Sequence, residues 1–159
     1  MPHPPWDLAG PDSLYAAKTL FGEAIDHLAP FQSLETTLQG RACSVLRLCD
    51  RNFRIAYTGR LDHMVAALDK DLWVKQFDWL GSVSLPVNLF SSLTKHAKVR
   101  PPHRLTTLPN HCAVPAQLNN IPVLIWRHPV HNQPTLDLHV ANTDLETLTS
   151  LCERLTPDN

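Results

Sequence analysis

The side chains best suited to chemistry in this chain are its histidines and cysteines, several of which fall between residues 103 and 131. His128 and His131 are spaced as H-x-x-H, and His111 is followed directly by Cys112. Imidazole and thiolate bind zinc, but zinc sites usually have paired short spacings on both sides of a loop, or H-E-x-x-H on a helix. Neither pattern occurs here. We therefore expect no metal and no other cofactor.

Covalent catalysis has weak support. Cys112 could act as a nucleophile only beside a histidine in the folded chain, which sequence alone does not show. The motifs G-x-S-x-G, P-loop and G-x-G-x-x-G are absent from a chain that has only five glycines, so common acyl-transfer and nucleotide-binding sites are not expected. Catalytic residues stay unassigned. The four cysteines lack C-x-x-C spacing, and we expect buried thiols and no disulfide.

Two arginines are candidate ligand contacts. Arg47 and Arg127 lie on or beside predicted strands, where an inward guanidinium could hold a carboxylate through two hydrogen bonds; most such arginines face solvent instead. Arg47 shares its face with Cys43, Val45 and Cys49, so if this apolar face is the core, the guanidinium needs a buried anionic partner.

Two aromatic residues could form the wall of such a pocket. Trp126 is next to Arg127, and Phe90 follows a glycine-containing segment that includes Gly81. A large aromatic side chain more often fills a core than lines a site, so both interpretations remain open for these residues.

Composition limits the classes of partner. The chain has 159 residues, 43% of them hydrophobic, and a formal net charge of -1, which is typical of one globular domain without a basic surplus for nucleic acid. It has no apolar stretch long enough to span a membrane and no signal peptide, so we expect a cytoplasmic protein that binds neither nucleic acid nor membrane.

Hydrophobic periodicity predicts an α+β domain. Residues 1–10 look like an N-terminal arm, and residues 11–159 like a single domain. Helices are expected over residues 13–28, 86–97 and 143–155, with a shorter one after residue 61; a capping box, Thr143 with Glu146, would open the last long helix. We find no internal repeat in the sequence.

Strands are expected mainly in hairpins. Residues 42–49 and 53–58 surround one turn, and residues 112–118 and 121–128 surround Asn119-Asn120. Residues 103–108 and 136–140 complete an antiparallel sheet of about five or six strands flanked by helices.

Three segments resemble the chorismate pyruvate-lyase family. They are Ser44–Asp50 continuing through Phe53–Ala56, the run from Leu80-Gly81-Ser82 to Leu89-Phe90, and Asn120–Ile125. The resemblance implies a chorismate lyase-like fold, found in bacterial enzymes and regulators, with an enclosed pocket for aromatic carboxylates and cofactor-free release of pyruvate and 4-hydroxybenzoate. The family's functional positions do not carry over: its strand arginine falls on Ser44, and its glutamate falls on Arg127.

These departures weigh against the lyase activity more than against the fold. The leading hypothesis is a non-catalytic or diverged protein that binds a small anionic aromatic metabolite through Arg47 or Arg127, with Trp126, Phe90 and Gly81 at the pocket. One alternative is an active chorismate lyase. Another is a regulatory or interaction protein in which the C-terminal strand and helix, residues 136–155, pair across a homodimer or partner interface.

Overall fold

The computed structural model describes residues 3–157, and the chain divides into two compact units, Met1–Asp78 and Trp79–Asn159. Each unit has its own hydrophobic cluster. The single domain expected over residues 11–159 is therefore seen as two units, which are described one at a time.

The first unit is a five-stranded antiparallel sheet with helices on one face. The strand order is β5-β1-β4-β3-β2. Its elements are β1 (Trp6–Ala9), α1 (Ser13–Phe21), the 3-10 helix η1 (Glu23–His27), β2 (Gln32–Leu38), β3 (Arg41–Cys49), β4 (Asn52–Ala56), α2 (Leu61–Ala66) and β5 (Trp73–Gln76). Gly22, with φ of 105°, separates α1 from η1, so the helix expected over residues 13–28 is divided.

The segment expected to be an arm contains strand β1, which pairs with β4 on one side and β5 on the other. Trp6 and Leu8 point into the core of the first unit, where they are 4% and 0% exposed. Their burial beside Phe53 and Ile55 removes apolar area from water. Residues 6–9 thus belong to the centre of the sheet.

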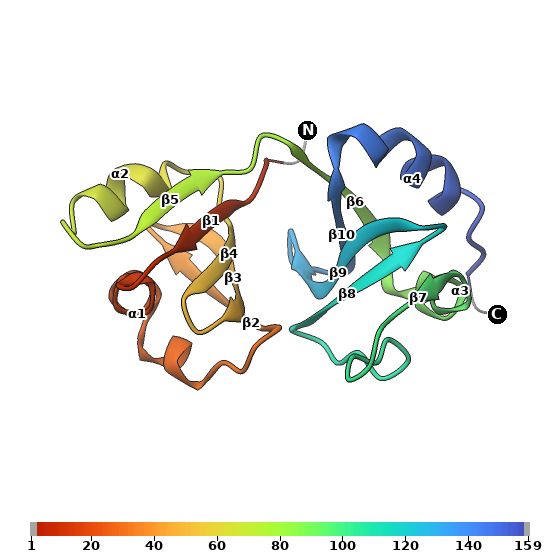
Figure 1. Ribbon diagram of the computed structural model, residues 1–159, viewed down its shortest axis with the longest axis horizontal. Coiled ribbons are helices and arrows are strands. Elements are labelled where there is room, and N and C mark those ends of the chain that lie inside the picture. Colours follow the sequence, from red (N-terminus) through yellow and green to blue (C-terminus); the bar gives the residue numbers. More distant parts are fainter. Residues whose placement is uncertain (1–2, 158–159) are drawn as a thin grey trace. The chain divides into compact units, whose positions relative to one another are not determined.

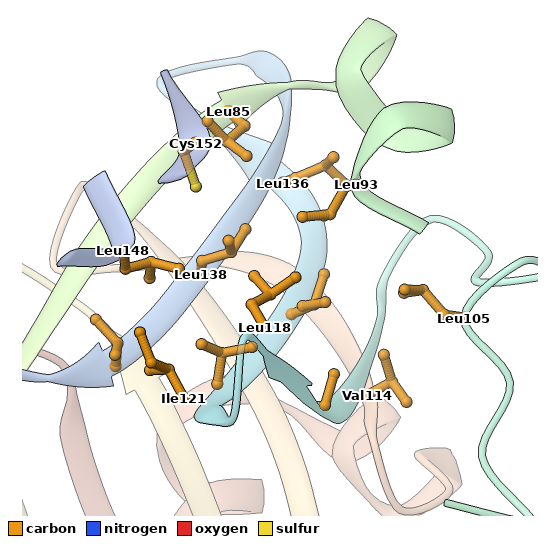
Figure 2. Packing of buried hydrophobic residues seen from close by; sticks show 14 of the residues in the cluster. Leu85, Leu93, Leu105, Val114, Leu118, Ile121, Leu136, Leu138, Leu148 and Cys152 are labelled. Carbon is orange, nitrogen blue, oxygen red and sulfur yellow. The ribbon is translucent and has the colours of Figure 1, made fainter. Parts of the chain in front are cut away.

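The second unit is a four-stranded antiparallel sheet in the order β8-β9-β10-β6, and the short strand β7 pairs with β8. Its elements are β6 (Leu80–Pro86), η2 (Val87–Leu89), α3 (Phe90–His96), β7 (Ala97–Lys98), β8 (Cys112–Leu118), β9 (Ile121–Val130), β10 (Gln133–Ala141), η3 (Asn142–Asp144) and α4 (Leu145–Cys152). Figure 2 shows how leucines from the strands meet Leu93 of α3 and Leu148 of α4 in the core.

The two units repeat one topology. In each, a strand and a helix precede a three-stranded meander, whose last strand pairs with that first strand and leads into a second helix. The first hairpin of each meander turns on two residues with positive φ, Gln39-Gly40 and Asn119-Asn120, as tight hairpin turns require. No internal repeat is visible in the sequence, because the shared features are turn geometry and alternation rather than residue identity.

The expected α+β class and antiparallel pairing are confirmed. Residues 3–157 contain ten strands rather than five or six. Residues 103–108 form no strand, and no side-chain bond caps α4. The C-terminal strand β10 lies between β9 and β6, so it is not the free edge that the expected dimer through residues 136–155 needed.

Two further observations concern the described residues. The four cysteines are free thiols. No helix within residues 3–157 is long and apolar enough to cross a membrane.

Candidate functional site

A buried polar cluster lies on the sheet of the second unit, on the face opposite its helices. Strand alternation places Leu136, Leu138 and Val140 of β10 in the helix-covered core, so Asp137 and His139 project from the other face. They are 7% and 5% exposed. Buried charged groups are uncommon unless they are paired, which makes this face the first place to look for function.

Asp137 is the centre of the cluster. Its Oδ2 atom lies 3.1 Å from Nε2 of His128 and 3.1 Å from Nε2 of His139. Ser82 of β6 donates its hydroxyl hydrogen to Oδ1 of Asp137 at 2.6 Å. Because an ionised carboxylate only accepts hydrogen bonds, both Nε2 atoms carry protons.

Aromatic rings complete the cluster. The indole of Trp126, 0% exposed, stacks on the imidazole of His128 with ring centroids 3.7 Å apart and planes at 15°. The same indole meets His139 edge-on, with centroids 5.9 Å apart. We call Ser82, Trp126, His128, Asp137 and His139 the Asp137 cluster.

Opposing effects set the ionisation of Asp137. Burial alone would raise the pKa of its carboxyl, but the charge of His139 and the hydrogen bonds from both imidazoles and Ser82 outweigh it and hold the pKa well below its ordinary value. The carboxylate is therefore ionised at neutral pH, and its partners are two imidazoles and a hydroxyl rather than lysine or arginine.

The connectivity limits the chemistry of the cluster. In a Ser-His-Asp triad the histidine stands between the hydroxyl and the carboxylate, whereas here Asp137 stands between Ser82 and the histidines. Ser82 is thus not activated as a nucleophile by a histidine. Within residues 3–157, no group of three or more histidine, cysteine, aspartate or glutamate side chains is arranged to hold a metal ion.

Arg47 lies on the helix side of the first unit, 8% exposed, on the same face as Cys43 and Val45, as its position predicted. Its Nη1 donates to the carbonyl of Leu28 at 3.1 Å, and the guanidinium lies 5.6 Å from the ring centroid of Phe53. An exposed carboxylate, Asp50 Oδ1, is 3.7 Å from Nη2. The guanidinium therefore anchors the loop before β2.

Arg127 has the same role in the second unit. Its Nη1 donates to the carbonyl of Leu108 at 3.1 Å, and the guanidinium lies 5.6 Å from the ring centroid of Phe90. The backbone N–H of Phe31, just before β2, donates to the carbonyl of Arg47. In the same way the backbone N–H of His111, just before β8, donates to the carbonyl of Arg127. The two arginines are corresponding anchors, and a role of either in holding a carboxylate ligand stays a prediction.

The five residues predicted for the site do not form one group. Arg127 and Phe90 meet on the helix side, while Trp126, the neighbour of Arg127 on β9, faces the Asp137 cluster. Gly81 packs against α4: a Cβ there would lie 2.9 Å from Leu145 Cδ2, so this glycine has a packing role. Arg47 belongs to the first unit.

Sequence reasoning missed Asp137, His139 and Ser82. A strand over residues 136–140 was expected, but alternation alone does not show that Asp137 and His139, on the face opposite Leu136 and Leu138, are buried. The available signal was the pairing of a carboxylate and an imidazole two residues apart on one strand, since such residues share a face. His128 was considered only with His131, which lies in the turn between β9 and β10 with φ of 50°.

Among solved structures, the chain is similar to the glycine cleavage system aminomethyltransferase T from Bartonella henselae, with a TM-score of 0.68 and 12% sequence identity over 92% of this chain. The chain spans 42% of the length of that protein. No protein-family model and no curated protein matches the sequence. At this identity the likeness shows the fold alone.

The resemblance to the chorismate pyruvate-lyase family was wrong. The fold matches part of an aminomethyltransferase instead. The run that carried most of the resemblance, starting at Leu80-Gly81, forms the continuous strand β6 before η2. A helix was expected from Pro86, but Gly81 and Pro86 both lie within this strand.

Proposed function

We propose that this chain binds a small anionic aromatic molecule at the Asp137 cluster. The observation that carries the proposal is the carboxylate of Asp137 shared by two buried imidazoles on a sheet face that bears no helix. The proposal keeps the class of ligand predicted from the sequence and moves its site from the arginines to the second unit's polar face.

The charge of the cluster supports an anionic ligand. Both ion-pair partners of Asp137 are imidazoles, which can carry a positive charge. An anion bound beside the cluster would favour the protonated imidazoles and be stabilised by them in a poorly hydrated environment.

The rings support an aromatic ligand. Trp126 and His128 form a stacked pair, and His139 meets the indole edge-on, so the cluster already holds flat rings in the stacked and edge-to-face contacts that an aromatic ligand would make. Ser82, on β6, is partly exposed and hydrogen-bonds Asp137. It therefore connects the cluster to the surface at that strand.

Burying such a cluster has an energetic cost, which supports function over packing. Buried ion pairs are often no more stable than apolar residues of similar volume, and groups with strongly shifted pKa values gather at functional sites. The aminomethyltransferase named above is an enzyme on the same fold, but with 12% identity the proposal for this chain is limited to binding.

Thermal unfolding in the presence of aromatic acids tests the proposal. We would use benzoate, 4-hydroxybenzoate, indole-3-carboxylate and their uncharged amides as probes. A bound acid at a hundredfold its Kd adds about 2.7 kcal/mol to the folded state, and we expect stabilisation by at least one acid and not by its amide. No stabilisation by any acid, or equal stabilisation by acid and amide, contradicts the proposal.

Two variants locate the site. His139→Gln keeps a polar side chain but cannot become charged, so it should weaken acid binding at least about tenfold. Ser84→Ala is the matched control, because Ser84 is exposed on the neighbouring strand, opposite Asp137. Each variant is compared with its own ligand-free unfolding temperature, so that lost stability is not mistaken for lost binding. If His139→Gln responds to the acid like the wild type, the acid binds elsewhere.

A further inference from the structure

We infer that a second copy of this chain pairs along strand β6, joining two second units into one continuous antiparallel sheet. β6 is the terminal strand of its sheet and pairs on one side only, with β10. The inference does not depend on the proposed ligand, because it rests on backbone hydrogen bonds rather than on the Asp137 cluster.

The pattern of bonds to β10 shows which groups of β6 point outward. The carbonyl of Trp79 accepts the N–H of Asn142 at 2.8 Å, so these two residues are a hydrogen-bonded pair just before β6. Hydrogen-bonded and non-bonded pairs alternate along an antiparallel ladder. Leu80, Ser82 and Ser84 therefore direct their N–H and C=O groups away from β10.

Pro86 fits this assignment. It occupies the next outward position in the register, opposite Thr135, and proline is tolerated in a sheet only where no ladder N–H is needed. The outward edge thus ends at a residue that cannot donate, which limits the pairing segment to the residues before it.

Before Pro86, the edge lacks two common protections against pairing, short length and charged side chains. β6 has seven residues and no charged side chain among them. By contrast β5, the terminal strand of the first unit, has four residues and includes the exposed Lys75. Short length and lysine are common ways in which proteins keep an edge strand from associating.

The sequence of β6 is complementary to itself. A two-fold axis at Val83 places Ser82 opposite Ser84 of the second copy, and the two Val83 side chains opposite each other. Serines then meet serines on the polar face, and Val83 continues the apolar face that includes Leu85. Every outward donor of one copy meets an outward acceptor of the other, which favours a second copy over an unrelated segment and gives a closed dimer.

Ser84→Pro tests the pairing. The N–H that proline removes points away from β10, so the ladder of the second unit keeps its bonds, while the dimer loses one hydrogen bond in each copy. We expect the wild type to be a dimer by light scattering, and Ser84→Pro to dimerise at least about tenfold more weakly. Ser84→Ala retains the N–H and should remain a dimer. A monomeric wild type at millimolar concentration overturns the inference, and so does a Ser84→Pro variant that folds cooperatively and dimerises like the wild type.

A cysteine scan tests the register. Val83 faces its own copy in a non-hydrogen-bonded pair, where Cα atoms are about 4.5 Å apart, within disulfide range. In a Cys49→Ser background, which removes the exposed native thiol, Val83→Cys should oxidise to a covalent dimer. Ser84→Cys should not, because it faces Ser82 of the second copy. Equal cross-linking of both variants, or of neither, contradicts the two-fold arrangement.

Discussion

The two units have the same strand order but opposite charge at the centre of the sheet face opposite their helices. In the first unit Arg54 stands opposite Leu46 on one side and Asp7 on the other. In the second unit Asp137 stands opposite Trp126 and Ser84. The helix-covered faces of the two units are more alike. In both, an arginine on the second strand of the meander hydrogen-bonds a carbonyl of the loop that leads into the meander.

This difference separates what the fold needs from what it permits. The meander needs its turns and its loop anchor, and these are present twice. The face opposite the helices has no such requirement, since one unit places a guanidinium at the position where the other places a carboxylate with two histidines. The Asp137 cluster is therefore a property of the second unit rather than of the fold, which is the reason for assigning function to it.

The largest loss of folding stability should follow from truncating the buried residues that directly precede Arg47 and Arg127. Leu46 and Trp126 are both 0% exposed, and truncation to alanine leaves a cavity in either unit. We expect Leu46→Ala and Trp126→Ala each to destabilise by about 3 to 5 kcal/mol, measured by urea unfolding. Hydrogen exchange should show the loss mainly in the substituted unit; protection lost equally throughout the chain would contradict the division into two units.

The response to acid should differ in sign between the two faces. The pKa of Asp137 is lowered in the folded state, so its stabilising contribution is present above its ordinary value of 3.8 and is lost as the pH falls below it. Burial raises the pKa of Asp7 from 3.8, although a hydrogen bond from Trp73 and the charge of Arg54 oppose the shift. Asp7 therefore destabilises the fold as the pH rises through and above 3.8.

Asp137→Asn and Asp7→Asn test this contrast. Removing one partner of a buried ion pair costs roughly 3 kcal/mol or more, so Asp137→Asn should destabilise the chain at neutral pH and flatten the loss of stability toward acid. Asp7→Asn should instead steepen that loss, since it removes the opposing effect. Unfolding free energies measured from pH 2 to 7 give both slopes. The same change in slope for the two variants would show that their environments do not differ as the structure indicates.

Sequence patterns predicted the parts of the fold that depend on local interactions. Asn119-Asn120 tolerates the positive φ of a hairpin turn, and the flanking alternation gave β8 and β9 correctly. β6 was not predicted, and a helix was expected from Pro86, because glycine and proline are both frequent at turns. Only tertiary structure shows that Gly81 makes room for Leu145 and that Pro86 occupies an outward position on an edge.

The candidate site was harder to predict for a physical reason. Alternation identifies which side chains share a face, but not whether a polar face is buried or which strands bring their side chains together. His128 and Asp137 come from two strands, and Ser82 from a third, so their meeting depends on register. Alternation placed Arg47 on the face of Cys43 and Val45 but left open whether that face is the core. The partners of Arg47 were missed because they are backbone carbonyls, which every residue has and which no sequence pattern therefore marks.

The smallest expected effect concerns the two arginine anchors, and it tests the feature that the units share. Arg47→Met and Arg127→Met keep much of the apolar stem that packs on Phe53 or Phe90 but remove the hydrogen bonds to the carbonyls of Leu28 or Leu108. Each should cost about 1 to 2 kcal/mol, and the two losses should be similar because the geometries match.

The same two variants decide between anchor and ligand contact. An anchor acts on the loop it holds, so each variant should lose hydrogen-exchange protection at the start of its own meander, and the stabilisation by an aromatic acid should be unchanged. If Arg127→Met instead abolishes that stabilisation while its unfolding free energy stays at the wild-type value, the guanidinium holds the ligand and the binding site lies on the helix side of the sheet. Because Arg47 has the same contacts without a neighbouring Asp137 cluster, it is the internal control for this choice.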